Sequence, residues 1–162
     1  MISNDSSKTV AKLHVNGDTH EVMIRSADTL LQTLREQLGL IGAKRACENG
    51  DCGACTVLVD GKPIHSCLSL AIECIDHQVM TIEGLPDNHI QKTFINHWAI
   101  QCGYCTPGFI INTYALSQKH SNASDGVIEE WMQSNLCRCT GYQEIKEAIK
   151  TVLENSEEGT AS

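Results

Sequence analysis

The sequence has few aromatic residues, only 4% of its 162 positions, and it contains no long run of apolar ones. A core must therefore rest on aliphatic side chains, and no segment approaches the roughly 20 apolar residues that a membrane-spanning helix requires. Residues 1–8 also lack an apolar signal core and a twin-arginine pair. These absences predict a cytoplasmic protein that makes no contact with a membrane.

Positive charge is also scarce, with 12 Lys and Arg against 20 Asp and Glu and a formal net charge of −8. Nucleic-acid phosphates require a basic face, so we expect no nucleic-acid partner. No Ser/His/Asp set, glycine-rich nucleotide loop or pair of carboxylates has a convincing catalytic pattern. We therefore expect no catalytic residue in this chain.

Cysteine, in contrast, is abundant, with nine residues. Persistent disulfides are disfavoured in a reducing compartment, and an odd number of thiols cannot all pair. Two domains of about 75 residues would each be marginal on apolar burial alone, and small domains of that kind commonly depend on disulfides or metal. The composition therefore predicts that most of these cysteines bind metal.

A Gly- and Pro-containing segment at 83–90 separates two regions of different pattern, and we predict domains at 1–84 and 85–162. Alternating apolar residues and tight-turn pairs make the first region strand-rich, and helical periodicity dominates the second. The predicted elements are hairpins at 12–24 and 56–64, a strand at 79–82, and helices at 28–39, 88–99, 107–120, 125–135 and 143–154. The polar tail, 155–162, is predicted to be disordered.

Residues that begin and end helices sharpen three of these predictions. Asp28 or Ser26 is expected to cap the first helix, and Gly39 to end it. Pro107 suits the first turn of its helix, because its missing N–H costs nothing there. Ser124 or Asp125 is the expected cap of the helix that follows.

The first set of cysteines is Cys47, Cys52, Cys55 and Cys67. Its C-x4-C-x2-C spacing with a fourth cysteine further on is the plant-type arrangement for a 2Fe–2S cluster. Gly50 and Gly53 allow the intervening loop to adopt positive dihedrals and to point N–H groups at the sulfurs. A structural zinc site is the alternative, but zinc sites commonly show paired C-x2-C units and this region has only one.

The second set pairs Cys102 with Cys105 and, after 31 intervening residues, Cys137 with Cys139. Zinc is a serious competitor here, because two cysteine pairs near helix ends are a common zinc arrangement. The C-x-C pair is unusual for zinc, and the first set already favours iron and sulfur. Both pairs precede helices, whose N-termini favour an anionic group. Arg138 either offsets negative charge there or is an ordinary surface residue.

Four stretches, 42–47, 50–61, 101–108 and 135–142, resemble the small iron–sulfur subunit of the xanthine oxidase family of molybdenum hydroxylases. This resemblance covers residues 9–154 and implies an α+β chain, with an N-terminal ferredoxin-like β-grasp domain followed by a C-terminal four-helix domain. The sequence departs from the family at Ala46, where relatives usually carry Gly, and its linker and 31-residue gap are slightly short.

The resemblance also implies an oxidoreductase subunit in a hetero-oligomer with a large molybdopterin-binding subunit and an FAD-binding subunit. Electrons would pass from molybdenum through the helical-domain cluster and then the ferredoxin-like cluster to FAD. Gln101 and Cys139 would lie against the pterin. Family frequency favours a purine or another N-heterocycle as the substrate. Two alternatives stay open, a free-standing ferredoxin-type carrier and a zinc-stapled interaction domain.

The remaining candidates have simpler interpretations. Cys74 has no partner at ligand spacing and is expected to be a buried apolar side chain. Trp98 and Trp131 are expected to anchor the core or a subunit interface. The seven histidines show no metal-ligand spacing and are expected at the surface or in interfaces.

Overall fold

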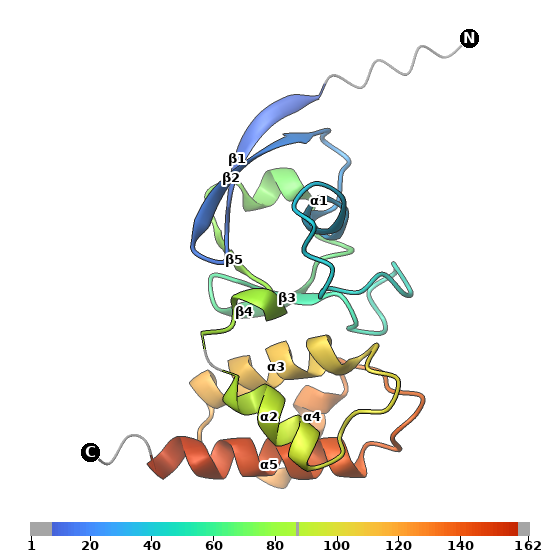
Figure 1. Ribbon diagram of the computed structural model, residues 1–162, viewed down its shortest axis with the longest axis vertical. Coiled ribbons are helices and arrows are strands. Elements are labelled where there is room, and N and C mark those ends of the chain that lie inside the picture. The colour runs from blue at the N-terminus through green and yellow to red at the C-terminus, as the bar shows by residue number, and fades with distance from the viewer. Residues whose placement is uncertain (1–7, 87, 159–162) are drawn as a thin grey trace.

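The computed structural model describes residues 8–86 and 88–158 and shows a sheet-containing region followed by a helical one (Figure 1). The predicted α+β class is confirmed. The strands are β1 (Thr9–Val15), β2 (Asp18–Ile24), β3 (Thr56–Val59), β4 (Lys62–His65) and β5 (Gln78–Met80). The α-helices are α1 (Leu30–Glu36), α2 (His89–Asn96), α3 (Thr106–Lys119), α4 (Asp125–Met132) and α5 (Gln143–Glu158).

The five strands form one sheet in the order β2-β1-β5-β3-β4. β1 and β5 are parallel, and the other neighbours are antiparallel. Both predicted hairpins are present, because Asn16-Gly17 and Asp60-Gly61 supply the consecutive positive φ angles that a two-residue turn requires. Helix α1 packs against the sheet, because its residues Leu30, Leu31 and Leu34 are buried in one cluster with Leu13 of β1.

Helix α1 is shorter than predicted, and neither Asp28 nor Ser26 caps it. Thr29 is the N-cap, and its hydroxyl accepts a hydrogen bond from the Gln32 N–H at 3.2 Å. The helix ends at Glu36, before Gly39, whose φ of +69° redirects the chain.

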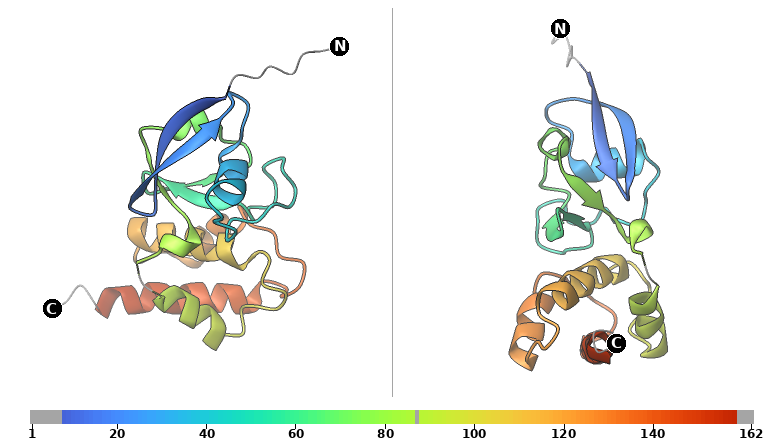
Figure 2. Two further views of the ribbon diagram at one scale, coloured as in Figure 1. Left: turned by 45° about the horizontal axis from the view of Figure 1, so that its top comes forward. Right: turned by 90° about the vertical axis from the view of Figure 1, so that its left-hand side faces the viewer.

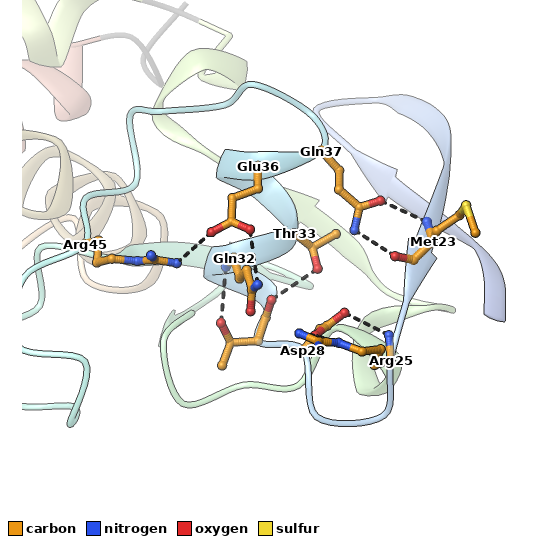
Figure 3. Close-up of polar contacts among 9 residues, drawn as sticks. Met23, Arg25, Asp28, Gln32, Thr33, Glu36, Gln37 and Arg45 are labelled. Atoms are coloured by element: carbon orange, nitrogen blue, oxygen red, sulfur yellow. Dashed lines mark hydrogen bonds and ion pairs between the residues drawn. The ribbon is translucent and has the colours of Figure 1, made fainter. Parts of the chain in front are cut away.

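Asp28 is unavailable as a cap because Arg25 holds its carboxylate. The backbone N–H of Arg25 donates to one carboxylate oxygen and its Nε–H to the other, both at 2.8 Å (Figure 3). The side-chain hydrogen bond from Arg25, followed by the backbone one, lowers the pKa of Asp28. At the other end of α1, the Gln37 amide exchanges two hydrogen bonds with the backbone of Met23 and so ties the helix to β2.

The helical region contains the four predicted helices. Pro107 lies in the first turn of α3, as predicted, and Ser124 is the N-cap of α4, without a side-chain hydrogen bond. The predicted disorder is wrong for residues 155–158, because α5 continues through them beyond its buried residues Val152 and Leu153. Residues 159–162 lie outside the described residues.

Helix α3 joins the two regions and lies between the sheet and α5 (Figures 1 and 2). Leu58 of β3 packs with Ile111 and Ala115 of α3 in a small buried cluster between the two main cores. The chain passes from the sheet-containing region to the helical region near the short 3-10 helix Ile82–Gly84. The predicted division at residues 84 and 85 stays a prediction. Within the described ranges, no helix is both long and apolar enough to cross a membrane.

Candidate metal centres

The loop between α1 and β3 carries three cysteines of the first site, Cys47, Cys52 and Cys55. Gly50 and Gly53 have φ angles of +86° and +66°, as the sequence predicts. The backbone N–H of Cys52 is directed at Cys47 Sγ, at 3.4 Å. The N–H groups of the loop lower the pKa of Cys47 to about 7, against the opposing effect of burial, and the largest contribution comes from Asn49. The loop thus favours a thiolate.

The fourth cysteine, Cys67, reaches this loop because a hairpin of the right length separates it from Cys55. β3 and β4 pair antiparallel, so that Cys55 before the hairpin and Ser66 after it face each other. Ser66 holds the open end of the hairpin together, because its N–H and its hydroxyl both donate hydrogen bonds to the Cys55 carbonyl, at 3.4 and 2.7 Å. Burial, and then contact with Cys55, raise the pKa of Cys67 to about 11. The two thiols therefore lie side by side in an apolar corner.

The second site brings together two loops that are far apart in sequence. Cys139 Sγ lies 3.6 Å from Cys102 Sγ, too far for a disulfide bond of about 2.05 Å. Two thiolates on one tetrahedral metal, with metal–sulfur bonds of about 2.3 Å, would lie at a similar separation of about 3.8 Å. Both residues are exposed, so this pair forms the outer edge of the site.

The other two cysteines of the second site form its inner edge. Cys137 is buried and Cys105 partly so, and their side chains are in contact. Burial is the main cause that raises the pKa of Cys105 to about 12, and the side-chain hydrogen bond with Cys137 is the second. Burial also acts to raise the pKa of Cys137, but hydrogen bonds from the Thr140 hydroxyl and from the Thr140 and Cys139 backbones lower it overall. Thiolate-stabilising donors therefore surround Cys137.

The two sites are directly hydrogen-bonded to each other. The N–H of Leu136 donates to the Cys52 carbonyl, and the Asn135 amide nitrogen to the Gly53 carbonyl, both at 2.9 Å. Asn135 is itself held by a buried hydrogen bond from the Asn112 amide. A polar contact this well satisfied fixes one loop against the other.

Two glycines permit this approach. A Cβ on Gly53 would lie 2.2 Å from the Ser134 carbonyl oxygen, and one on Gly108 would lie 2.3 Å from that of Gly53. The sequence predicts Gly53 only as a residue with a positive dihedral angle, and no motif in it predicts a functional role for Gly108 or Asn135. The available signal for Gly108 is its place directly after Pro107 in the first turn of α3, where glycine is a poorer helix former than other residues.

The other predicted residues lie as follows. Gln101 is exposed next to Cys102, and Arg138 is exposed between the two C-x-C cysteines. Cys74 is buried in the cluster that also contains Leu13 and Leu30, which confirms its apolar role, and burial raises its pKa. Trp131 packs partly against the buried cluster of the helical region, which includes Phe109, whereas Trp98 is 81% exposed.

The donor sets fit iron–sulfur clusters. Each site offers four thiols, and in each at least one sulfur receives backbone N–H groups of the kind that stabilise anionic sulfur. In the parts of the chain that the structure describes, no three Cys, His, Asp or Glu side chains converge as ligands of a single metal ion.

Comparison with known proteins agrees with this chemistry in both halves. Residues 13–80 match the family model for a 2Fe-2S iron-sulfur cluster binding domain, and residues 81–150 match that for a 2Fe-2S binding domain. The nicotinate dehydrogenase small FeS subunit of Eubacterium barkeri is 38% identical, over 91% of this chain and 97% of the relative. The chain belongs to the small iron–sulfur subunits of the xanthine oxidase family of molybdenum hydroxylases.

Solved structures support the same assignment for this iron–sulfur subunit. Quinoline 2-oxidoreductase from Pseudomonas putida 86 matches with a TM-score of 0.88 and 36% identity, over 95% of this chain and 99% of the matched chain. Aldehyde oxidoreductase from Desulfovibrio gigas matches with a TM-score of 0.87 and 33% identity, over 93% of this chain but 17% of that longer one. The predicted β-grasp and four-helix architecture is confirmed.

The iron–sulfur subunit therefore serves electron transfer within a larger oxidoreductase. The relative from Eubacterium barkeri is named as a small subunit, and this naming confirms a heteromeric complex. The matches do not favour a free-standing carrier or a zinc-stapled interaction domain.

Proposed function

We propose that this subunit holds one 2Fe–2S cluster at the first site and a second at the second site, and relays electrons from a molybdopterin centre to FAD in partner subunits. The proposed ligands are Cys47, Cys52, Cys55 and Cys67, and then Cys102, Cys105, Cys137 and Cys139. When bound, such a cluster takes up and returns one electron at a time. The observation that carries the proposal is the direct hydrogen bond between the two ligand loops, from Leu136 to Cys52.

The subunit's own residues supply the connection between the sites. Leu136 is covalently joined to Cys137, and its N–H reaches the carbonyl of Cys52. A short path therefore runs from one ligand to another through two covalent segments and one hydrogen bond. The surrounding Asn112–Asn135 contact is buried, which excludes water and keeps this geometry fixed.

The proposed direction of transfer is the one that the family resemblance implies, and exposure indicates which edge would meet each partner subunit. Cys102 and Cys139 are exposed, and Gln101 lies beside them, so this edge suits contact with the large molybdopterin-binding subunit. Cys47 and Cys52 are half-buried, and the residues next to them at 45–46, 48–49 and 51 are exposed, so this part of the loop suits contact with an FAD-binding subunit. Electrons would enter at the first of these edges and leave at the second.

Trp98 extends the proposed contact with the large subunit. It lies three residues before Gln101 and combines an exposed indole with a φ of +56°, a conformation that costs about 1–2 kcal/mol for a residue other than glycine. Ile95, in the last turn of α2, is also exposed and adds apolar surface. Aromatic side chains of this kind frequently anchor protein interfaces.

For the substrate of the complex, we propose an N-heterocycle. Two of the relatives described above are named for nicotinate and quinoline, which are both nitrogen heterocycles, and a third for aldehydes. The substrate would bind in the large subunit, so the residues of this chain do not select it.

Substrate reduction of the assembled complex under anaerobic conditions tests the route. With Cys52→Ser, we expect substrate to reduce the second-site cluster while reduction of FAD slows. With Cys139→Ser, the block should come earlier in the route, so that substrate reduces neither cluster at the normal rate. Cys74→Ala, which changes a buried cysteine outside both sites, is the matched control. If FAD is reduced at the normal rate in Cys52→Ser, the proposed order is wrong.

A further inference from the structure

The sharp loop between Cys137 and α5 carries a hydroxyl group that the proposed route does not use. The Thr140 hydroxyl lies 3.2 Å from Cys137 Sγ, to which it donates a hydrogen bond. Thr140 is half-buried and Cys137 is 8% exposed. This hydrogen bond therefore lies where the low local dielectric strengthens it.

The direction of the Thr140 hydroxyl is set by its neighbour Tyr142. The N–H of Tyr142 donates to Thr140 Oγ1 at 3.3 Å, so the hydroxyl accepts there and its own hydrogen is free to point at Cys137 Sγ. Tyr142 also closes the loop from the other side, because its hydroxyl accepts the N–H of Cys137 at 3.0 Å. Its ring packs edge-on against Phe109, which holds it in place.

We propose that Thr140 is a positioning residue that acts through Cys137 and raises the reduction potential of the second-site cluster. This inference rests on the proposed function, because it requires Cys137 to be an iron ligand. Reduction adds one electron and no atoms, so the negative charge at the ligand sulfurs increases. A hydroxyl donor stabilises that added charge more than it stabilises the oxidised state, and hydrogen bonds to cluster sulfurs are among the determinants of potential.

A higher reduction potential at the second site would favour the entry of electrons into this subunit. A second-site cluster with a higher potential accepts electrons more readily from the large subunit, through the exposed edge at Cys102 and Cys139. The backbone N–H groups of Cys139 and Thr140 also point at Cys137 Sγ, but a side-chain substitution leaves them in place. The Thr140 hydroxyl is therefore the part of this set that mutation can test.

The test is an EPR-monitored redox titration of the full chain with both clusters loaded, comparing wild type with Thr140→Val and Thr140→Ser. We expect Thr140→Val to shift the one-electron equilibrium of the second-site cluster toward the oxidised state by up to tenfold, or about 59 mV. Thr140→Ser should stay close to wild type. The first-site cluster should not change in either variant.

Thr113→Val is the matched control, because this buried α3 hydroxyl bonds only the Phe109 carbonyl among the contacts described. Thr140→Ala provides a second hydroxyl-free variant without added branching. An unchanged potential in Thr140→Val and Thr140→Ala would overturn the proposal, as would equal shifts in Thr140→Val and Thr140→Ser. If both hydroxyl-free variants lose the second cluster while Thr140→Ser keeps it, the residue retains metal and does not tune it. A wild-type chain without two distinct signals would instead contradict the proposed function.

Discussion

The carbonyl of Cys52 accepts a 2.9 Å hydrogen bond from the N–H of Leu136, the residue that precedes Cys137. This bond joins two loops separated by more than half of the chain, and each loop carries proposed iron ligands. It turns two cysteine motifs into one continuous path. Neither motif is sufficient for that path, because its geometry depends on how closely the two loops approach.

Gly108→Ala tests the close approach of the loops. The added Cβ would lie 2.3 Å from the Gly53 carbonyl oxygen, so the loop or α3 must move. We expect a loss of about 1–3 kcal/mol in the free energy of unfolding and slower transfer between the clusters, measured by denaturant unfolding and by stopped-flow reduction. Gly126→Ala is the control, because a Cβ there meets nothing within 4 Å, and it should not reduce stability. Unchanged transfer in a folded Gly108→Ala variant would contradict this account.

Trp98→Gly should change stability and assembly in opposite directions. Glycine relieves the positive φ at the end of α2, where the Ala99 N–H bonds the Phe94 carbonyl at 2.9 Å, and so should raise stability by about 1 kcal/mol. The same change removes the proposed anchor, and we expect the affinity for the large subunit to fall at least tenfold, an effect typical of an interface hot spot. Ile95→Ala should weaken assembly without the gain in stability. Thermal unfolding and a binding titration measure the two effects, and unaltered binding by Trp98→Gly would rule out the anchor.

Asp28→Asn should make the first region less stable near neutral pH by about 1–3 kcal/mol, the cost of disturbing a buried, charge-assisted set of hydrogen bonds. Because Arg25 lowers the pKa of Asp28, this stabilisation is fully present above the unfolded value of about 3.9 and is lost as pH falls through the folded value. The difference between wild type and Asp28→Asn should therefore be constant from pH 7 to about pH 5 and shrink below about pH 4. Urea unfolding across that range measures it, with the exposed Asp76→Asn as the control. A difference that grew toward acid pH would have the wrong sign.

Local signals in the sequence predicted local structure well. Asn16-Gly17 and Asp60-Gly61 specify their turns through backbone preferences that need no distant contact, and both hairpins form where expected. Gly50 and Gly53 likewise have the positive dihedrals expected of the first ligand loop. The predicted N-cap of α1 was wrong because the Asp28 carboxylate could accept hydrogen bonds either from the start of the helix or from Arg25. In the structure it accepts them from Arg25.

Contacts between distant segments could not be predicted in this way. Asn135 is a polar residue of a kind common in loops, and only the fold shows that it is buried and bonded to Gly53. Gly108 is likewise explained by the neighbouring carbonyl rather than by its own helix. No period or spacing encodes such contacts, since they arise when two separately folded surfaces meet.

The most direct test of the central claim is EPR and iron analysis of the reduced, anaerobically isolated chain together with its Cys52→Ser and Cys139→Ser variants. We expect about four iron atoms per wild-type chain and two distinct 2Fe–2S signals. Cys52→Ser should alter only the first-site signal, and Cys139→Ser only the second-site signal. A chain free of iron, or variants that leave both signals unchanged, would contradict the account.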